Sequence, residues 1–352
     1  MPIQKTIRGT SKKKKRQHTS KRKLSFVKKH EYNPILTSNS EHYWELSQTF
    51  NPSSILLGDK IHFLYRAVGA DGISRLGYAV SNDGVTIEDR QLHPVYEHGS
   101  NRYLLSSISY PSGGSSGGAE DPRIVRVGKE NKLYMTYTAC DDSGLRVGLT
   151  SISLDDFLCK DWKWNAPALI SPVGEVHKNW VLFPEKIGGQ YAILHSIRPK
   201  IAIAYVDSLE SLLPIESSYS AVPELHTWEK RIRGAGPPPI KTKGGWLLFY
   251  HAMDSDTGKY KVGAMLLDLL DPTIIRHRSR GPVLEPDQSY ENNGFKGGVV
   301  YVSGAVVKDG TIFLYYGGAD SCVCVAYSNL ESFLEKLIEG KGPKLKKLKR
   351  KL

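Results

Sequence analysis

The stretch RIVRVGKENKLYMTYTA, residues 123–139, contains two β-prone runs separated by a turn that carries glycine. This pattern predicts a β-hairpin, because glycine readily adopts the positive φ that a tight turn needs. The pattern occurs five times along the chain, at 54–67, 123–139, 181–196, 239–252 and 304–318. A third β-prone run follows each hairpin, at 75–84, 146–157, 201–212, 261–272 and 323–334. The chain is therefore built from five copies of one three-stranded unit.

The repeat also predicts how the units are arranged. A small antiparallel sheet cannot bury both of its faces alone, and radial stacking of such sheets leaves only short, protected edges. We therefore predict an all-β fold, a five-bladed β-propeller over residues 31–340. A pair of packed sheets would explain the turns but not the repeat. One short helix is expected over residues 330–338.

The charge of the chain is concentrated at its two ends. The formal net charge is +12, but residues 1–30 carry twelve Lys or Arg and residues 341–352 carry seven, with no acidic residue in either segment. The body then has 29 basic and 36 acidic residues. Dense runs of like charge stay solvated and attract anions. We predict a disordered basic tail over 1–30 and a second basic tail over 341–352, each able to contact polyanions weakly.

Cysteine usage and hydropathy bear on the cellular compartment. The four cysteines, Cys140, Cys159, Cys322 and Cys324, include no Cys-x-x-Cys pair that would suggest a metal site. No apolar run approaches the ~18 residues of a membrane span, and the basic N-terminal run is not followed by the apolar segment of a signal peptide. We expect a cytoplasmic protein without a membrane span and without a bound metal.

Equivalent positions of the repeats should meet in one place. In a propeller the first strand of each blade lines the central channel, so residues at the start of this strand and at the end of the next should face a common pocket. The first set is Asn51, Asp121, Glu185 and Gly236, and the second is Arg66, Thr138, His195, His251 and Gly317. Acids, an arginine and histidines stand where packing alone favours small or apolar residues. The pattern indicates a polar pocket in the channel.

Asp121 is the first candidate for chemistry in that pocket. Its neighbour Glu120 should point to the opposite face of an extended strand, so only one of the two can face the channel, and periodicity does not say which. Pro122 should hold Asp121 in an extended backbone. Cleavage of a glycosidic bond needs a proton donor and an acceptor or nucleophile across the sugar, which a channel acid beside cations could supply. A carboxylate that only caps the strand is the alternative.

An ordered set of motifs carries a family resemblance. The motifs are FNPS (50–53), YRA (65–67), GAEDPR (118–123), LFPEK (182–186), GAGPPPI (234–240), GWLLFYHA (245–252), ENNG (291–294) and YYGGAD (315–320). Together they resemble glycoside hydrolase family 130, the β-mannoside phosphorylases and β-mannosidases. The resemblance implies a five-bladed propeller that cleaves β-mannosidic bonds with inversion, in many members by attack of inorganic phosphate to give α-mannose 1-phosphate.

The resemblance also implies roles for individual residues. Asp121 falls on the general acid of the family, whose proton is thought to travel through the 3-hydroxyl of the sugar. Asn51, Arg66 and Asp320 fall on residues that bind the mannose unit. His251 falls near both the phosphate and the sugar.

The phosphate side departs from the family pattern. Lys178 and Asn179 stand where family phosphorylases have Arg-Asn, and Ser196 and Ile232 replace two further cations. Fixed cations hold a phosphate dianion beside the reacting carbon, so their loss weakens the case for phosphorolysis. Compensation could come from three nearby arginines, Arg198, Arg231 and Arg233. The expected phosphate-binding residues are Lys178, Asn179, His251, Arg231 and Arg233.

Three functions remain open on this basis. We predict phosphorolysis of a β-mannoside oligosaccharide, with inorganic phosphate as co-substrate and no other cofactor. The first alternative is an inverting β-mannosidase, in which Glu185 or Glu229 would act as the base that activates water. The second is a propeller that binds glycans without catalysis. Association into a homo-oligomer is a further expectation.

Overall fold

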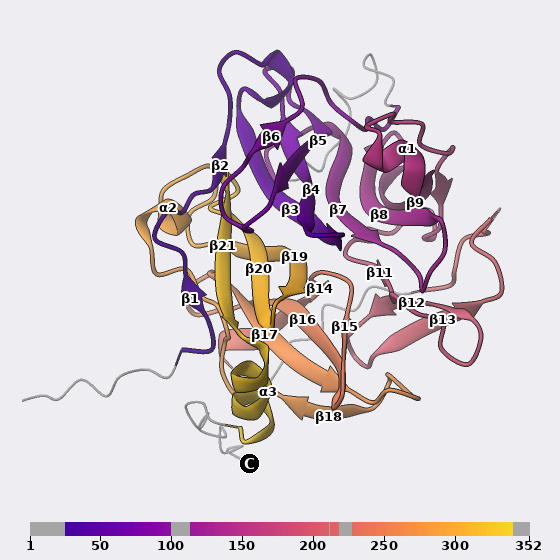
Figure 1. Ribbon diagram of the computed structural model, residues 1–352, viewed down its shortest axis with the longest axis vertical. Coiled ribbons are helices and arrows are strands. Elements are labelled where there is room, and N and C mark those ends of the chain that lie inside the picture. Colours follow the sequence, from indigo (N-terminus) through magenta and orange to yellow (C-terminus); the bar gives the residue numbers. More distant parts are fainter. Residues whose placement is uncertain (1–24, 100–112, 211, 218–226, 341–352) are drawn as a thin grey trace, which may run out of the picture.

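The computed structural model describes residues 25–99, 113–210, 212–217 and 227–340 (Figure 1). Within these residues the fold is all-β, with three short α-helices: α1 (Leu154–Leu158), α2 (Ser289–Asn292) and α3 (Leu330–Ile338). Helix α3 confirms the helix predicted over 330–338. None of the described helices is long and apolar enough to cross a membrane.

The strands form five groups that follow the chain. The first group is β3 (Gln48–Leu57), β4 (Lys60–Val68), β5 (Ile73–Ser81) and β6 (Asp89–Arg90). The second is β7 (Gly117–Val125), β8 (Lys132–Asp141), β9 (Gly144–Ser153) and β10 (Ala168–Leu169). The third is β11 (Val181–Leu182), β12 (Tyr191–Ser196) and β13 (Ala202–Val206).

Two larger groups complete the fold. The fourth is β14 (Arg231–Ala235), β15 (Ile240–Thr242), β16 (Gly245–Met253), β17 (Tyr260–Leu267) and β18 (Ile275–Arg278). The fifth is β19 (Val300–Lys308), β20 (Thr311–Gly318) and β21 (Cys322–Asn329), joined by β1 (Lys28–Lys29) and β2 (Leu36–Thr37). The five predicted hairpins and third strands are thus confirmed.

The groups are antiparallel within themselves and succeed one another around the middle of the molecule in Figure 1. They make four sheets rather than five, because a short parallel pairing of β5 with β7 joins the first two groups into one eight-stranded sheet. That pairing matches Ile73 with Gly117 and Ser74 with Gly118.

The N-terminal strands pair with the last strand of the fold. Lys28 in β1 lies opposite Tyr327 in β21, and Leu36 in β2 lies opposite Val323. Phe26 is buried against Phe333 of α3, with ring centroids 5.2 Å apart. Residues 25–30, which we assigned to the basic tail, therefore belong to the folded body. The remaining predicted tail residues, 1–24 and 341–352, lie outside the described residues.

A bulge interrupts the first strand in four of the groups. The pairing register shifts between Phe50 and Ser53 in β3 and between Glu120 and Arg123 in β7. Equivalent shifts occur in β14 and β19. At the first two bulges a residue in front of proline has a positive φ, 46° at Asn51 and 48° at Asp121. The extended backbone that we expected at Asp121 is therefore wrong, because the bulge takes this residue to the left-handed region, which Asn and Asp tolerate best.

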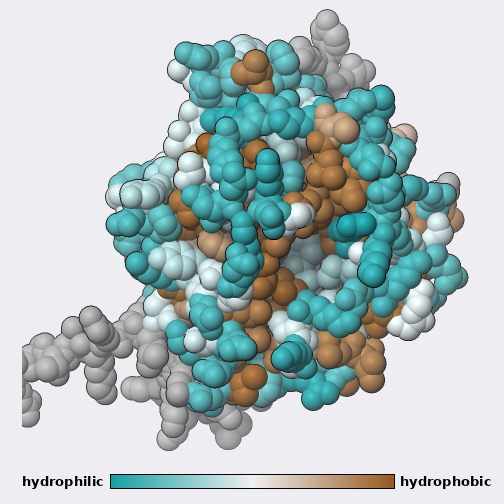
Figure 2. All heavy atoms as spheres, viewed as in Figure 1, coloured by the Kyte–Doolittle hydropathy of each residue, from teal (hydrophilic) through white to brown (hydrophobic). Residues whose placement is uncertain are grey.

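The two ends of these first strands border different cavities. Residues near the start of β3, β7 and β19 line a polar cavity, whereas residues 54–58, 124–126 and 305–307 at their other ends line a mostly apolar cavity of about 590 Å³. Figure 2 shows apolar residues beside a hollow in the middle of the molecule. The chemistry-bearing residues therefore gather at one end of the strands only.

Glycines in the third strands make room for tyrosine rings. Tyr250 in β16 lies opposite Gly263 in β17, and a Cβ added at Gly263 would coincide with the Tyr250 ring. The same pairing joins Tyr65 to Gly77 and Tyr137 to Gly148. Glycine weakens a strand by itself, but here it lets an aromatic ring cross the neighbouring strand and fill the core.

Three of the five strand groups have a buried glutamate that accepts a hydrogen bond from a tyrosine hydroxyl. Tyr250 donates to Glu229 at 2.6 Å, and Arg278 donates to the same carboxylate oxygen at 2.7 Å. Tyr65 and Arg90 bind Glu45 in the same way, at 2.9 and 2.6 Å. In the fifth group Tyr316 and Lys29 bind Glu291. Each network links the segment before a group to a long strand of that group: β4, β16 or β20. The contacts of Glu229 are therefore those of a structural residue.

We expect Gly263→Ala to destabilise the fold strongly, because the new methyl group would displace the Tyr250 ring from a closely packed core. Overpacking of this kind typically costs about 1–3 kcal/mol. Urea unfolding would measure the loss, with Gly99→Ala as the control, since a Cβ at Gly99 has nothing within 4 Å. Equal stability of the two variants would contradict the packing argument.

We expect Glu229→Gln to lose stability but keep turnover at a temperature where it stays folded. The neutral amide would leave the Arg278 guanidinium without its charged partner, at a cost of about 1–3 kcal/mol. Glu45→Gln, in the equivalent network, should lose a similar amount. If Glu229 were the base that activates water, Glu229→Gln would instead lose turnover with little loss of stability.

Candidate active site

The polar cavity, called the main cavity below, has a volume of about 310 Å³. This is within the range of small-molecule sites. It is lined by residues from the first, second, fourth and fifth groups and from the loops between groups: Phe50, Asn51, Arg66, Gly113, Asp121, Leu145, Val176, Lys178, Asn179, Arg233, Tyr260, Lys296, Val299, Tyr301 and Asp320. Asn51, Arg66, Asp121, Lys178, Asn179, Arg233 and Asp320 were all expected here, so the structure brings most of the candidate residues together.

Asp121 projects from the bulge of β7 into a cluster of donors. Its Oδ1 accepts hydrogen bonds from Asn51 Nδ2 at 2.8 Å and Arg66 Nη1 at 3.3 Å. Burial by itself would raise the pKa of Asp121, but Arg66, Arg123 and Lys178 stabilise the carboxylate and, with the Asn51 hydrogen bond, bring the pKa below its usual value. The carboxyl group is therefore ionised at neutral pH.

Arg66 is buried between two carboxylates. Its Nη2 donates to Glu120 Oε1 at 3.1 Å and its Nη1 to Asp121, while Nε is held by Ser74 at 2.9 Å. Burial opposes the charge, but the attraction of Glu120 and Asp121 is stronger and raises the pKa of Arg66 above its usual value. Glu120 and Asp121 thus contact the same guanidinium, contrary to the opposite faces expected of an extended strand, because the bulge breaks the alternation.

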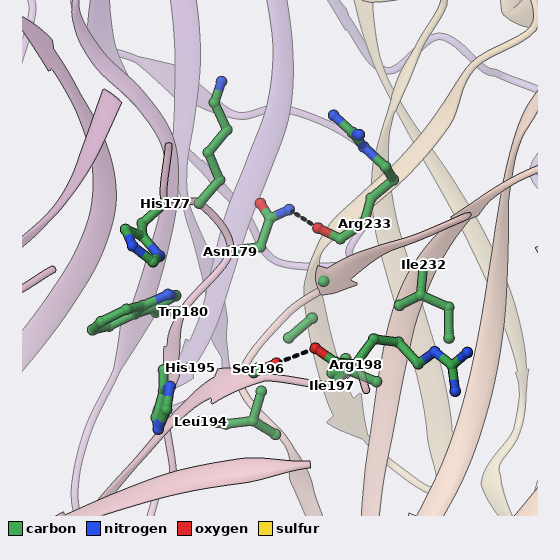
Figure 3. A pocket seen from close by; sticks show the side chains of 13 residues that line it. His177, Asn179, Trp180, Leu194, His195, Ser196, Ile197, Arg198, Ile232 and Arg233 are labelled. Carbon is green, nitrogen blue, oxygen red and sulfur yellow. Dashed lines mark hydrogen bonds between the residues drawn. The ribbon is translucent and has the colours of Figure 1, made fainter. Parts of the chain in front are cut away.

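Cations gather on the side of the main cavity next to the third and fourth groups. Lys178 Nζ donates to Glu120 Oε2 at 2.9 Å, and Asn179 Nδ2 donates to the backbone oxygen of Arg233 at 2.9 Å. Lys178, Asn179 and Arg233 also line a small side cavity of about 30 Å³ (Figure 3). These three residues therefore stand between the two cavities.

The side cavity contains the two positions at which a family cation is replaced by an uncharged residue. Ser196 and Ile232 line it together with Arg198, and Figure 3 shows Ser196 bonded to the backbone oxygen of Arg198. Arg198 and Arg233 both line this cavity. Arg231, the third arginine considered for compensation, is exposed at the start of β14 and lines neither cavity. Two of the three arginines are thus near the substituted positions.

His251 lies behind the wall of the main cavity rather than on it. The ring is fully buried, stacks on Tyr301 at 3.7 Å between centroids, and donates from Nε2 to the Val302 oxygen at 2.8 Å. Burial is the main reason that its pKa is lowered to about 3, and the charge of Arg123 adds to it. His251 is therefore neutral, and it supports Tyr301, which lines the cavity.

Asp320 supplies the second carboxyl group of the wall. It follows β20 in a left-handed turn with φ 49° and has 7% of its surface exposed. Burial raises its pKa to about 6, against the opposing attraction of Lys296 and Arg66, and the charge of Asp121 raises it further. Two carboxyl groups with pKa values moved in opposite directions therefore face one cavity.

The other predicted carboxylates lie elsewhere. Glu185 is half exposed and forms an ion pair with Lys241, a residue that lines the apolar cavity at the far end of the strands. Glu229 is buried in its network with Tyr250 and Arg278. Neither lines the main cavity, because one lies at the opposite end of the fold and the other in the interior of the fourth group.

Sequence reasoning missed several residues of the site, among them Arg123, Tyr301 and Lys296. Arg123 donates to the backbone oxygen of Asp121 and, at 3.2 Å, to Asn179 Oδ1. Tyr301 also donates to Asn179 Oδ1, and Lys296 packs over the Tyr260 ring at 4.5 Å. Arg123 had a signal, since it ends the GAEDPR motif. Tyr301 also had one, at the second position of β19, which is equivalent to the start of β3 and β7.

The arrangement combines a carboxyl group with fixed cations around a cavity open to a ligand. A ligand hydroxyl or glycosidic oxygen could meet Asp121 from one side, and an anion could meet Lys178 and Arg233 from another. This chemistry suits group transfer to or from an anion.

Comparisons with known proteins agree with this geometry. The family model for glycoside hydrolase family 130, described as β-1,4-mannooligosaccharide phosphorylase, matches residues 13–339. A 1,2-β-oligomannan phosphorylase from Thermoanaerobacter sp. (strain X514) is 38% identical over 304 residues, which cover 83% of this chain and 94% of the relative. A β-1,2-mannobiose phosphorylase from the same organism is 36% identical with the same coverage.

A solved structure extends the comparison to hydrolases. It is of a protein from the family 130 mannoside phosphorylases, among which are glycoside hydrolases that target β-1,2-mannosidic linkages in Candida mannan. It superposes with a TM-score of 0.71 at 26% identity and covers 87% of this chain and 94% of its own. From the match over most of its length, the chain belongs to glycoside hydrolase family 130 and is an enzyme of the phosphorylase or glycosidase type.

Proposed function

We propose that the enzyme cleaves β-1,2-linked oligomannosides by phosphorolysis, with inversion, to give α-mannose 1-phosphate. The observation that carries the proposal is the placement of Asp121 in one cavity with Lys178 and Arg233. Relatives matched over 94% of their length act on β-1,2-mannosides by name, which supports this linkage.

In this mechanism different residues of the cavity wall bind the sugar and the phosphate. Asn51, Arg66 and Asp320 hold the mannose unit, and Lys178, Asn179 and Arg233 hold the phosphate. As a phosphate oxygen forms its bond to the anomeric carbon, the bond to the leaving sugar breaks, and the proton of Asp121 passes to the leaving oxygen. The proton that phosphate loses restores the acid through solvent. Attack from the face opposite the leaving group inverts the configuration.

Asp121 must gain a proton before it can act as the acid, and phosphate binding would favour this step. Arg66, Arg123 and Lys178 lower its pKa. A phosphate dianion near Lys178 would offset part of that positive charge, and a negative charge next to a carboxylate raises its pKa. Phosphate binding would then favour the protonated acid at the stage when a proton is needed.

Hydrolysis is the competing activity, because the family contains glycoside hydrolases. An inverting hydrolase needs a carboxylate base across the sugar from the acid. The lining residues of the main cavity include two carboxyl groups, Asp121 and Asp320, and neither Glu185 nor Glu229. Lys178 and Arg233, which also line this cavity, support an anionic nucleophile instead.

We extend the proposal to the architecture and the setting of the enzyme. The five strand groups would be the blades of a propeller, closed by the pairing of β1 and β2 with β21. All four cysteines are free, which suits a reducing cytoplasm. Association into a homo-oligomer and weak contact of the basic tails with polyanions remain predictions.

We expect sugar phosphate to form from β-1,2-mannobiose only when inorganic phosphate is present. Asp121→Asn should slow this reaction about 10²–10⁴-fold, because the amide cannot donate the required proton. Product analysis by ³¹P and ¹H NMR would identify the ester and its anomeric configuration.

Asp268→Asn is the control for that variant, since Asp268 pairs with Arg276 away from the cavity and should leave the rate unchanged. Release of free mannose at the same rate without phosphate would show a hydrolase instead. Full activity of Asp121→Asn would refute the role of this acid.

We expect Asp320→Asn to weaken mannoside binding but to stabilise the fold near neutral pH. The pKa of Asp320 is raised from 3.8 to about 6, so ionisation favours the unfolded chain progressively as pH rises between these values. The variant escapes this penalty, which is of the order of ~3 kcal/mol at pH ~7 and absent below pH ~4. Urea unfolding at both pH values measures the difference.

Asp254→Asn should change stability in the opposite direction, because Lys261 and backbone donors overcome the effect of burial and lower the pKa of Asp254. An Asp320→Asn protein no more stable than the wild type near neutral pH would contradict the raised pKa.

A further inference from the structure

A buried carboxylate behind the main cavity joins residues of the sugar side to residues of the phosphate side. Glu120 has no exposed surface. Its Oε1 accepts from Arg66 Nη2 at 3.1 Å and Ser115 Oγ at 3.0 Å, and its Oε2 accepts from Lys178 Nζ at 2.9 Å. Arg66 and Lys178 line the main cavity, whereas Glu120 does not. Glu120 therefore acts on the cavity only through its partners.

Glu120 and its two charged partners come from three different groups of the fold. Glu120 is in β7 of the second group, Arg66 is in β4 of the first, and Lys178 lies in the loop before β11 of the third. A fully buried carboxylate requires such partners, since an uncompensated buried charge is costly. One side chain thus sets the relative positions of three groups at the point where they meet the cavity.

We propose that Glu120 is a positioning residue for phosphate, fixing the Lys178 ammonium where the nucleophile binds. The inference rests on the proposed phosphorolysis. Lysine is a point charge on a flexible four-carbon stem, so its direction depends on a partner. Glu120 holds the ammonium of a residue that lines the main cavity.

The contacts of Arg66 predict that the two substrates respond differently. Arg66 also binds Ser74, Ser115 and Asp121, so its guanidinium stays oriented when Glu120 is neutralised. In Glu120→Gln the single amide oxygen can still accept a hydrogen bond from either Arg66 or Lys178. The amide NH₂ group then faces the other cation, and two donors cannot form a hydrogen bond with each other. The more flexible Lys178 gives way. Phosphate binding should suffer more than mannoside binding.

The test compares the KM values of the two substrates in Glu120→Gln, Glu120→Asp and Lys178→Ala. A charge-assisted hydrogen bond corresponds to about a tenfold to hundredfold change in affinity. We expect the KM for phosphate to rise by about that factor in Glu120→Gln, with the KM for β-1,2-mannobiose changed less than about threefold. Glu120→Asp, which keeps the charge, should recover part of the phosphate affinity.

A double variant separates positioning from general damage. If Glu120 acts through Lys178, combining Glu120→Gln with Lys178→Ala should raise the KM for phosphate little beyond the larger single effect, since coupled residues are non-additive. Glu229→Gln, equally buried but outside the cavity, is the matched control and should leave both KM values unchanged. Calorimetric titration of the folded proteins with inorganic phosphate gives the same comparison without turnover.

The outcomes are distinct. Equal rises in both KM values, additive effects in the double variant, or unchanged phosphate binding in every folded Glu120 variant would overturn the role of Glu120 while leaving phosphorolysis intact. If Glu120→Gln does not fold, Glu120→Asp decides instead, because its shorter side chain moves the carboxylate away from Lys178. A Glu120→Asp protein that is less stable but binds phosphate as well as the wild type would overturn the positioning role of Glu120. A wild-type enzyme that ignores phosphate would refute the proposed function itself.

Discussion

The burial of Arg66 is the constraint on which the site depends. A guanidinium with 1% of its surface exposed must have its charge balanced and its N–H groups bonded within the protein. Ser74, Ser115, Glu120 and Asp121 meet that need from β5, the segment before β7, and β7 itself. The first two groups are thereby held together at the end of their strands that faces the cavity, and Asp121 is placed with its charge already compensated.

Much of the fold could be predicted from the sequence because the hairpin is a local signal that recurs. The residues next to these turns, Arg66 in particular, could be placed for the same reason. The bulges could not, since a shift of register depends on the partner strand. That shift explains why Glu120 and Asp121 contact one guanidinium although their spacing in an extended strand would separate them.

The remaining errors in the candidate site have a common physical cause. Glu229 and Glu185 are carboxylates at positions where the sequence suggests a base for water. Each is instead paired with a residue distant in sequence, Glu229 with Tyr250 and Glu185 with Lys241. A tyrosine opposite a strand glycine was the available signal for the structural role of Glu229. His251 was expected near the sugar and the phosphate, but it stacks behind Tyr301, which was not predicted and which lines the cavity.

The pairing of β1 and β2 with β21 ties the two ends of the folded chain into one sheet. Contacts between residues so far apart in sequence are slow to form, because a long loop must close before they contribute. During synthesis β1 and β2 cannot complete their pairing until β21 has left the ribosome. Asp320 lies just before β21, so the wall of the main cavity is completed only after the first four groups have been made.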